Sequence, residues 1–180
     1  MTEPDQTPSN TPPRRRIVAL GGLVFLVLLA LGYWLLDRVP PGPDELFAQY
    51  FSVYEVPDEM IRASTEPERR AFLSAYVAGE YELAISTFDR LKPPADLDRL
   101  VYGVSYLAIG RPVGGMGALM AVTDHGESLS AQARWYLALA YLKMDDRENA
   151  SILLQNLIAN SAWNNERAVS LLRAISAQHR

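Results

Sequence analysis

Apolar residues recur at spacings of three and four along most of the chain, and no stretch alternates apolar with polar residues over many positions. The first pattern is typical of amphipathic helices, whereas strands would show the second. It runs through residues 66–160, and again through 163–180, where the apolar residues keep to one face. The sequence therefore predicts an all-α fold that ends in a capping helix.

Residues 17–36 form an uncharged, strongly apolar stretch of twenty residues. A helix of this length, at about 1.5 Å per residue, spans the roughly 30 Å hydrocarbon core of a bilayer. The stretch is longer than the apolar core of a usual signal peptide, and no small-residue cleavage site follows it. We therefore expect a retained transmembrane helix, with a cleaved signal peptide as the competing interpretation.

Charge on the two sides of this stretch indicates its orientation. Arg14, Arg15 and Arg16 precede it, whereas Arg38 is the only basic residue among the twenty residues that follow it. Basic residues stay on the cytoplasmic side. We expect residues 1–16, a polar and proline-rich tail that should be disordered, in the cytoplasm. A stiff proline-rich spacer over 37–43 then leads to a domain outside it, which is the periplasm if the anchor lies in a bacterial inner membrane.

Composition narrows the class of partner. The chain has no cysteine, so a translocated domain must hold together by packing without disulfides. Residues 39–180 carry 13 Lys and Arg against 18 Asp and Glu, a net charge of −5. A negatively charged domain argues against nucleic acid and against an anionic membrane surface as the binding target.

The chain also aligns with itself at offsets of 31 and 35 residues, which place Gly79, Gly110 and Asp145 at one position. Four further positions fall in the same register: Phe72 with Gly103 and Ala138, Tyr76 with Leu107 and Leu142, Ala84 with Gly115 and Ala150, and Phe88 with Leu119 and Leu154. Small residues let paired helices approach closely, and large apolar ones fill the layers between units. The alignment predicts about three helix pairs.

The stretch A-Y-V-A-G-E-Y-E-L-A-I-S-T-F, residues 75–88, resembles a tetratricopeptide repeat. G-V-S-Y-L-A-I-G, residues 103–110, is similar to the first helix of a second repeat, and R-W-Y-L-A-L-A-Y-L-K-M, residues 134–144, to that of a third. The resemblance implies a short α-solenoid over 66–160. Pro112 and Gly115 stand at unusual places for the family, so the second unit is expected to be distorted.

In this family the first helices of the repeats line a concave groove, which implies a protein or peptide partner, possibly helical. Carried over by register, the groove positions are Arg69, Leu73, Tyr76, Val77, Leu100, Val104, Leu107, Trp135, Leu139, Leu142 and Lys143. Leu73, Val104 and Leu139 stand where a clamp for a terminal carboxylate would need polar side chains. A clamp of that kind is therefore not expected.

Two features leave alternatives open. Residues 44–63 predict an aromatic-rich helix ahead of the repeats, with a stripe formed by Phe47, Tyr50, Phe51 and Tyr54. This helix either packs against the first unit or into the groove, or it presents its aromatic side chains to a partner. Trp135 is a binding anchor if it is exposed and a core residue otherwise.

Catalytic chemistry is not expected. The histidines are His125 and His179. Asp124 precedes His125 in a predicted turn, but adjacent loop residues rarely converge on one metal ion and no further ligand is near. The glycines within 110–117 lack the Lys-Ser/Thr pair of a phosphate-binding loop. We expect no enzyme, no metal and no cofactor.

These features predict a single-pass interaction scaffold that acts outside the cytoplasm. Its layout resembles that of ancillary subunits of the secretion translocon and of cell-envelope assembly factors, which implies a role in envelope assembly or translocation. The alternative is a membrane-bound regulatory or signal-sensing protein with the helical repeats as its sensor. A helical pocket for a lipid or small ligand is a further alternative.

Overall fold

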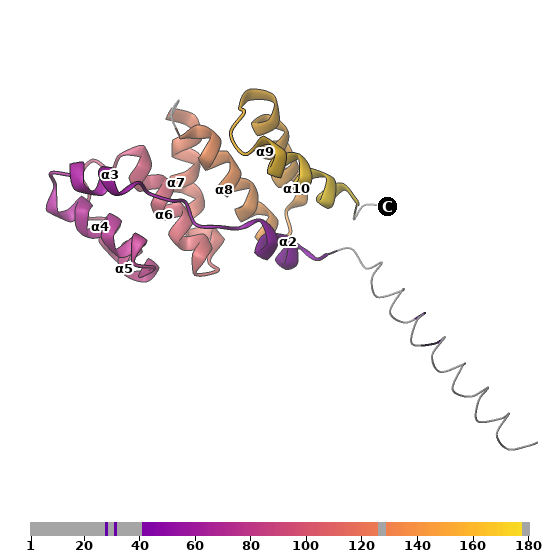
Figure 1. Cartoon of the computed structure of the whole chain (residues 1–180), viewed down its shortest axis with the longest axis horizontal. Coiled ribbons are helices and arrows are strands. Elements are labelled where there is room, and N and C mark those ends of the chain that lie inside the picture. The colour runs from indigo at the N-terminus through magenta and orange to yellow at the C-terminus, as the bar shows by residue number, and fades with distance from the viewer. Residues whose placement is uncertain (1–27, 29–30, 32–40, 126–128, 178–180) are drawn as a thin grey trace, which may run out of the picture. The chain divides into compact units, whose positions relative to one another are not determined.

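The computed structural model describes residues 28, 31, 41–125 and 129–177 (Figure 1). The chain divides into an N-terminal unit, Met1–Pro40, and a second unit, Pro41–Arg180. In the first unit Leu28 and Leu31 are helical and exposed. The predicted tail, the rest of the predicted span and most of the spacer lie outside the described residues. Within the described part of the chain, no helix combines the length and apolar character needed to cross a bilayer.

All regular structure in residues 41–125 and 129–177 is helical, which confirms the all-α prediction. In chain order the helices are α2 (Pro43–Tyr50), α3 (Asp58–Ala63), α4 (Pro67–Val77), α5 (Tyr81–Phe88), α6 (Asp96–Ala108), α7 (Pro112–His125), α8 (Ser130–Lys143), α9 (Arg147–Asn160) and α10 (Asn165–Ala177).

Helices α4 to α9 form three pairs, α4 with α5, α6 with α7 and α8 with α9. Each helix packs on the next one along the chain, and α10 packs on α9. In addition α4 contacts α6, and α6 contacts α8. The first helices of the pairs therefore stand side by side on one face of the array (Figure 1). We call this face, made by α4, α6 and α8, the inner face.

The same turn closes each pair. Gly79, Gly110 and Asp145, which the sequence alignment places at one position, adopt left-handed conformations with φ of 79°, 72° and 58°. Each donates its N–H to the carbonyl three residues before it, at 2.9 or 3.0 Å. The next residue, Glu80, Arg111 or Asp146, donates its own N–H to the carbonyl five residues before itself, at 2.9 Å. This is the Schellman arrangement, which favours glycine and tolerates aspartate because few residues adopt positive φ at low cost.

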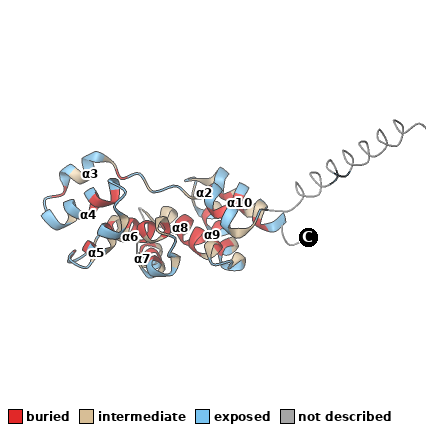
Figure 2. Ribbon diagram, turned by 90° about the horizontal axis from the view of Figure 1, so that it is seen from below, coloured by how far each residue is buried: buried red, intermediate tan, exposed pale blue. Residues whose placement is uncertain are grey.

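Helix α8 is buried almost all round, because it lies among α6, α7, α9 and α2. From Trp135 to Leu142 its sequence is apolar on every side, and eight residues of the helix are buried. A surface helix would show a single apolar stripe. The middle of the array is therefore the centre of the hydrophobic core, as the burial colours of Figure 2 show.

The two helices of the second pair approach each other closely. A Cβ built on Gly115 of α7 would lie 2.7 Å from the Cα of Gly103 and 2.8 Å from its carbonyl oxygen. Backbone atoms cannot move aside as the end of a side chain can. Gly103 and Gly115 are therefore required by the contact between α6 and α7, although glycine lowers helix propensity.

Replacing Gly115 by alanine is expected to lower the free energy of unfolding by about 1–3 kcal/mol, because α6 and α7 must move apart. Gly117, two residues on, is the matched control, since a Cβ there meets nothing within 4 Å. Gly117→Ala should raise stability by up to about 1 kcal/mol through helix propensity. Urea unfolding followed by circular dichroism measures both. If Gly115→Ala and Gly117→Ala changed the free energy of unfolding in the same direction, the close approach of α6 and α7 would be contradicted.

The stretch expected as one helix over 44–63 is two helices with an extended segment between them. Helix α2 ends at Tyr50, residues 51–57 are not helical, and α3 begins at Asp58. Phe51 and Pro57 have extended conformations, with ψ of 131° and 136°. Two causes are visible in the sequence: Pro57 disfavours a helical conformation at Val56, and the β-branched Val53 and Val56 favour extended backbone.

Candidate functional site

The inner face, where a partner was expected, is covered by the chain itself. We call residues 43–63 the strap, which consists of α2, the extended segment 51–57 and α3. Helix α2 packs on α8 and α10, and α3 packs on α4. The extended segment runs between these two ends across the array (Figure 1). The strap thus decides which inner-face residues another molecule can reach.

Eight of the eleven predicted groove residues are buried, with exposed fractions of 0–3%. They are Leu73, Tyr76, Leu100, Val104, Leu107, Trp135, Leu139 and Leu142. Arg69 and Lys143 are half-buried, and Val77 at the end of α4 is 53% exposed. The structure therefore brings the predicted residues together on α4, α6 and α8, but as part of the core with one exposed member.

Helix α2 holds its end of the strap through aromatic side chains. Tyr50 meets Trp135 edge-on, with ring centroids 6.4 Å apart, and its hydroxyl shares a hydrogen bond of 2.7 Å with Ser170. The Lys143 Nζ lies 2.6 Å from the Asp44 carboxylate and 5.1 Å from the Phe47 ring centroid. Two interpretations of the aromatic stripe were left open. In this arrangement the stripe packs on the chain's own helices.

The extended segment, together with Tyr50 at the end of α2, is held by its main-chain carbonyls. Side chains from three helices donate hydrogen bonds to carbonyls two residues apart. The three bonds are Arg167 Nη2 of α10 to Tyr50 O at 2.6 Å, the Tyr136 hydroxyl of α8 to Ser52 O at 2.9 Å, and the Tyr76 hydroxyl of α4 to Tyr54 O at 2.8 Å. Because successive carbonyls of an extended chain point to opposite sides, alternate ones face the helices.

These bonds require protonated tyrosines. Burial raises the pKa of Tyr76 and of Tyr136 well above the usual value of a phenol, and for Tyr76 the nearby Tyr136 raises it further. A phenolate would lose the proton that it donates and would be poorly solvated in a buried site, a cost that the Arg167 guanidinium offsets only in part at Tyr136. The hydrogen bonds to the strap therefore persist through the physiological pH range.

Stability is expected to fall steeply above pH about 10, because there the unfolded chain ionises these tyrosines while the fold keeps them neutral. A folded-state pKa above the unfolded value contributes stability that is complete below the unfolded pKa and is lost as pH rises. Each such tyrosine contributes a slope of about −1.4 kcal/mol per pH unit. Urea unfolding from neutral pH to about pH 11 measures the slope.

Tyr136→Phe and Tyr76→Phe provide the test of this assignment. Each removes one hydroxyl and keeps the ring, so each should remove one tyrosine's share of the alkaline slope. Each should also lower stability at neutral pH by about 1 kcal/mol through the lost hydrogen bond. An alkaline slope that neither substitution changes would show that other groups cause it.

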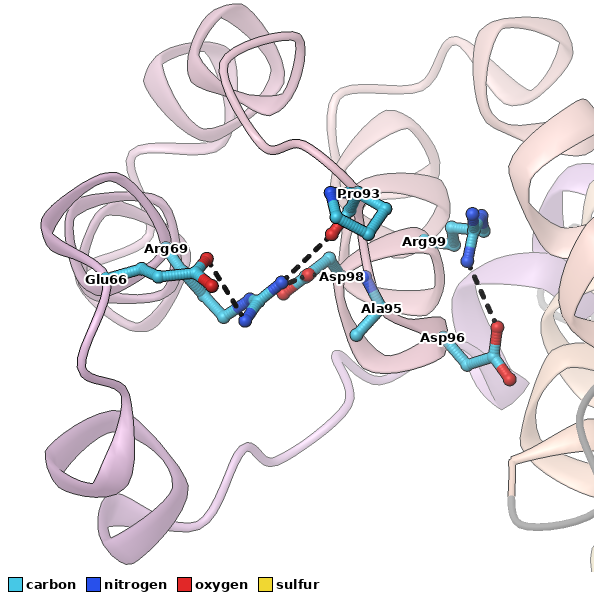
Figure 3. Close-up of polar contacts among 7 residues, drawn as sticks. All are labelled: Glu66, Arg69, Pro93, Ala95, Asp96, Asp98 and Arg99. Carbon is cyan, nitrogen blue, oxygen red and sulfur yellow. Dashed lines mark hydrogen bonds and ion pairs between the residues drawn. The ribbon is translucent and has the colours of Figure 1, made fainter.

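Arg69, expected on the groove, is engaged within the repeats (Figure 3). Its Nε lies 2.9 Å from Oδ2 of Asp98 on α6, and its Nη2 donates to the Pro93 carbonyl at 3.1 Å. The Asp98 side chain is 1% exposed, and the same Oδ2 accepts the N–H of Ala95 at 2.7 Å. Arg69 thus ties the first pair to the second and compensates a buried charge.

Beside the extended segment lies a hollow of about 290 Å³. Its walls are the segment itself from Ser52 to Glu55 and, on the helices, Trp135, Tyr136, Trp163, Asn164 and Arg167. Arg167 places its Cζ 5.2 Å from the Trp135 ring centroid, a cation–π arrangement. The hollow therefore combines aromatic walls with hydrogen-bond donors.

The residues considered for chemistry do not converge. His125 is the last residue of α7 rather than part of a turn, and Asp124 before it is exposed. Among residues 41–125 and 129–177, no group of three or more acidic or histidine side chains could hold a metal ion. The glycines of 110–117 lie at the turn and in α7, where Gly114 and Gly115 serve helix contacts.

Sequence reasoning missed Tyr136, Arg167 and the extended form of residues 51–57. Tyr136 stands next to Trp135 in a helix that is apolar on every side, so periodicity could not single it out. Arg167 lies in the terminal helix, which was expected only to cap the array. Val53, Val56 and Pro57 are the one signal that could have indicated an extended segment.

No protein-family model, curated protein or solved structure matches this chain.

Proposed function

We propose that this protein is a membrane-anchored scaffold that binds other proteins through a short array of tetratricopeptide-like helix pairs. Residues 17–36 are its transmembrane anchor, with residues 1–16 in the cytoplasm. The array of helices acts outside the cytoplasm, in the periplasm if the membrane is a bacterial inner membrane. The protein acts in assembly of the cell envelope or in translocation across it.

Three features support the repeat assignment. The helix pairs share one turn geometry at Gly79, Gly110 and Asp145. Matched small residues, Gly103 and Gly115 among them, allow the helices of the second pair to approach closely. The first helices stand side by side, as they do in solenoids that present one continuous face to a partner.

The observation that carries the proposal is the occupied inner face. Tyr136 of α8 and Tyr76 of α4 hold an extended peptide segment by hydrogen bonds to its Ser52 and Tyr54 carbonyls. Main-chain recognition does not depend on the sequence of the segment, and aromatic contacts such as that of Tyr50 with Trp135 add to it. A face built in this way is suited to binding peptide segments.

The strap changes how a partner reaches this face. Eight of the predicted groove residues are covered, so a partner meets the strap and the margin of the face first. Val77 is exposed at that margin, and Val53 is exposed on the strap itself. Trp135 on α8 and Tyr76 on α4, which contact Tyr50 and Tyr54 of the strap, become available to a partner only where the strap moves.

A photo-crosslinking scan in cells tests the proposal. A photoreactive residue replaces Val53 or Val77 at the inner face, and Val113 on α7, 67% exposed, serves as the control. We expect a discrete crosslinked protein from the first two positions and none from the control. Identical patterns from all three positions, or no crosslink at any, would overturn the scaffold assignment.

The alternative of a regulatory protein has one observation in its favour. The strap that fills the inner face begins at Pro43, close in sequence to the predicted anchor that ends at residue 36. Release of the strap would change the tether between domain and membrane. Partner capture that depends on residues 1–16 would favour this sensing role over a scaffold.

A further inference from the structure

The hollow beside the extended segment has the dimensions of a site for one small molecule. Its walls come from separate parts of the chain: the strap from Ser52 to Glu55, helix α8, and α10 with the two residues before it. The volume of about 290 Å³ lies just below the roughly 300–1,000 Å³ typical of small-ligand pockets. The hollow therefore suits one small ring rather than a peptide segment or a lipid chain.

Aromatic side chains form much of the hollow, and one of them is open to solvent. Trp135 and Tyr136 are 1% and 3% exposed, so they close the hollow on the side of α8. Tyr54 is half-buried, and Trp163 is 36% exposed. Of the tryptophans and phenylalanines that the structure describes, Trp163 is the only exposed one. An accessible ring face in a hollow favours an occupant with an apolar side, whose C–H groups meet the partly negative π-face.

The hollow contains one charge of each sign, Glu55 from the strap and Arg167 from α10. Neither side chain forms an ion pair within the described part of the chain. Burial raises the pKa of Tyr136, Arg167 lowers it and Glu55 raises it, so both charges act on this phenol. An anion in the hollow would be repelled by Glu55, and a cation by Arg167. The pair therefore favours a neutral occupant.

The polar groups of the hollow have hydrogen-bonding capacity that the chain leaves unused. The side-chain Nδ2 of Asn164 is buried and has no hydrogen-bond partner among the described residues. Arg167 donates from Nη2 to the Tyr50 carbonyl, and a guanidinium has five N–H groups. Glu55 is exposed and offers acceptor atoms only. A buried donor without an acceptor is costly, so the site favours groups such as hydroxyls, which both accept and donate.

A neutral saccharide ring combines these properties, because it has an apolar side of C–H groups, hydroxyls around its rim and no charge. We propose that the hollow binds one ring of a neutral saccharide, with the apolar side of the ring on Trp163. Hydroxyls of the ring accept hydrogen bonds from Asn164 and Arg167 and donate to Glu55. The sugar is either free or a unit of a longer glycan, since both present the same ring. This activity goes beyond the proposed scaffold function and does not rest on it.

Saturation-transfer NMR tests this binding, with the full-length chain in lipid nanodiscs and protein-free nanodiscs as the background. The probes are the methyl glycosides of glucose, galactose, mannose and N-acetylglucosamine. We expect saturation transfer to the ring C–H protons of at least one of them. Soluble oligosaccharides of the same sugar separate the two sources: tighter binding than that of the single ring indicates a glycan unit, and equal binding indicates a free sugar.

A series of charged sugars tests the preference for a neutral ring. At about pH 6 the uronic acid and the amino sugar of the same ring carry a negative and a positive charge. Each should bind at least about fivefold more weakly than the neutral sugar, because Glu55 repels the first and Arg167 the second. Glu55→Gln keeps an acceptor oxygen on an exposed side chain, so the neutral sugar should stay within about threefold while the uronic acid binds more tightly.

Two substitutions test the contacts with the ring. Trp163→Ala removes the exposed ring face and should weaken the neutral sugar about tenfold, whereas Val113→Ala, at an exposed position on α7, should leave it unchanged. Asn164→Gly removes the buried donor and should weaken the sugar about fivefold, while glycine readily adopts the φ of 54° found there. Asn164→Gly should not lower stability, because the group that it removes is unpaired. Lower stability with unchanged binding would instead assign Asn164 a structural role.

Several results would overturn the inference. They are the absence of saturation transfer to every saccharide, binding that neither Trp163→Ala nor Asn164→Gly weakens, and a uronic acid or amino sugar that binds more tightly than the neutral ring. If photo-crosslinking finds a partner at Val77 in any of these cases, the scaffold function stands and only the saccharide site fails.

Discussion

Replacing Trp135 by alanine is expected to lower the free energy of unfolding by about 3–5 kcal/mol. The side chain is 1% exposed and lies in α8, at the centre of the array. Its removal leaves a large cavity under α2, because the Tyr50 ring rests edge-on against it and the Arg167 guanidinium stacks on it. Urea unfolding followed by circular dichroism gives the size of the loss.

Trp163→Ala is the matched control for this experiment. Trp163 precedes α10 and is 36% exposed, so its loss removes less buried contact than the loss of Trp135 and should cost only about 1–2 kcal/mol. The difference between the two tryptophans measures what burial of Trp135 contributes. A loss below about 1 kcal/mol for Trp135→Ala would mean that the strap does not cover the indole in solution. Trp135 would then return as a candidate binding anchor.

The same substitution should loosen the strap before the rest of the fold. Amide hydrogen exchange of residues 43–50 should become faster in Trp135→Ala, whereas that of α6 should change less. Local opening follows from fewer buried contacts in one region. The strap depends on Trp135 at its α2 end and on tyrosine hydroxyls farther along.

Much of the helix array could be predicted from the sequence. The self-alignment at Gly79, Gly110 and Asp145 marks the three turns correctly, because the turn needs positive φ and only a few residue types adopt it. The offsets then place the small residues of the second pair where its helices touch. Periodicity and turn chemistry act locally, so a single sequence carries them.

The state of the inner face could not be predicted in the same way. The sequence of an apolar helix face has the same pattern whether a partner or the chain itself covers that face. Leu73, Val104 and Leu139 therefore did not indicate that they are buried within the chain. The strap is joined to α8 and α10 by contacts between residues 84 and 120 positions apart in sequence. Such contacts depend on the fold as a whole, and no local pattern reports them.

Arg69 illustrates a further limit. Its register position on the first helix marks it as a groove residue and so as a candidate for partner binding. The structure gives it a buried carboxylate, Asp98, from the next repeat. Register assigns a residue to a helix face, but it does not distinguish a side chain that reaches outward from one that bridges two repeats.

Arg69→Ala is expected to lower the free energy of unfolding by about 3 kcal/mol, because it leaves the Asp98 carboxylate buried without its counter-charge. Arg62→Ala is the control: the Arg62–Asp58 pair is 3.4 Å long with side chains 80% and 73% exposed, so its loss should change stability by about 0.5 kcal/mol or less.

The double variant Arg69→Ala with Asp98→Asn separates charge from packing, because asparagine keeps an oxygen that can accept from the Ala95 N–H at the start of α6. If the uncompensated charge causes the loss, the double variant should regain a large part of it, since removing both members of a buried pair costs less than removing one. A double variant no more stable than Arg69→Ala would instead assign the loss to the contacts of the Arg69 side chain with Pro93 and Glu66. In either case the loss appears as unfolding rather than as weaker partner binding, which distinguishes a bridge between repeats from a groove residue.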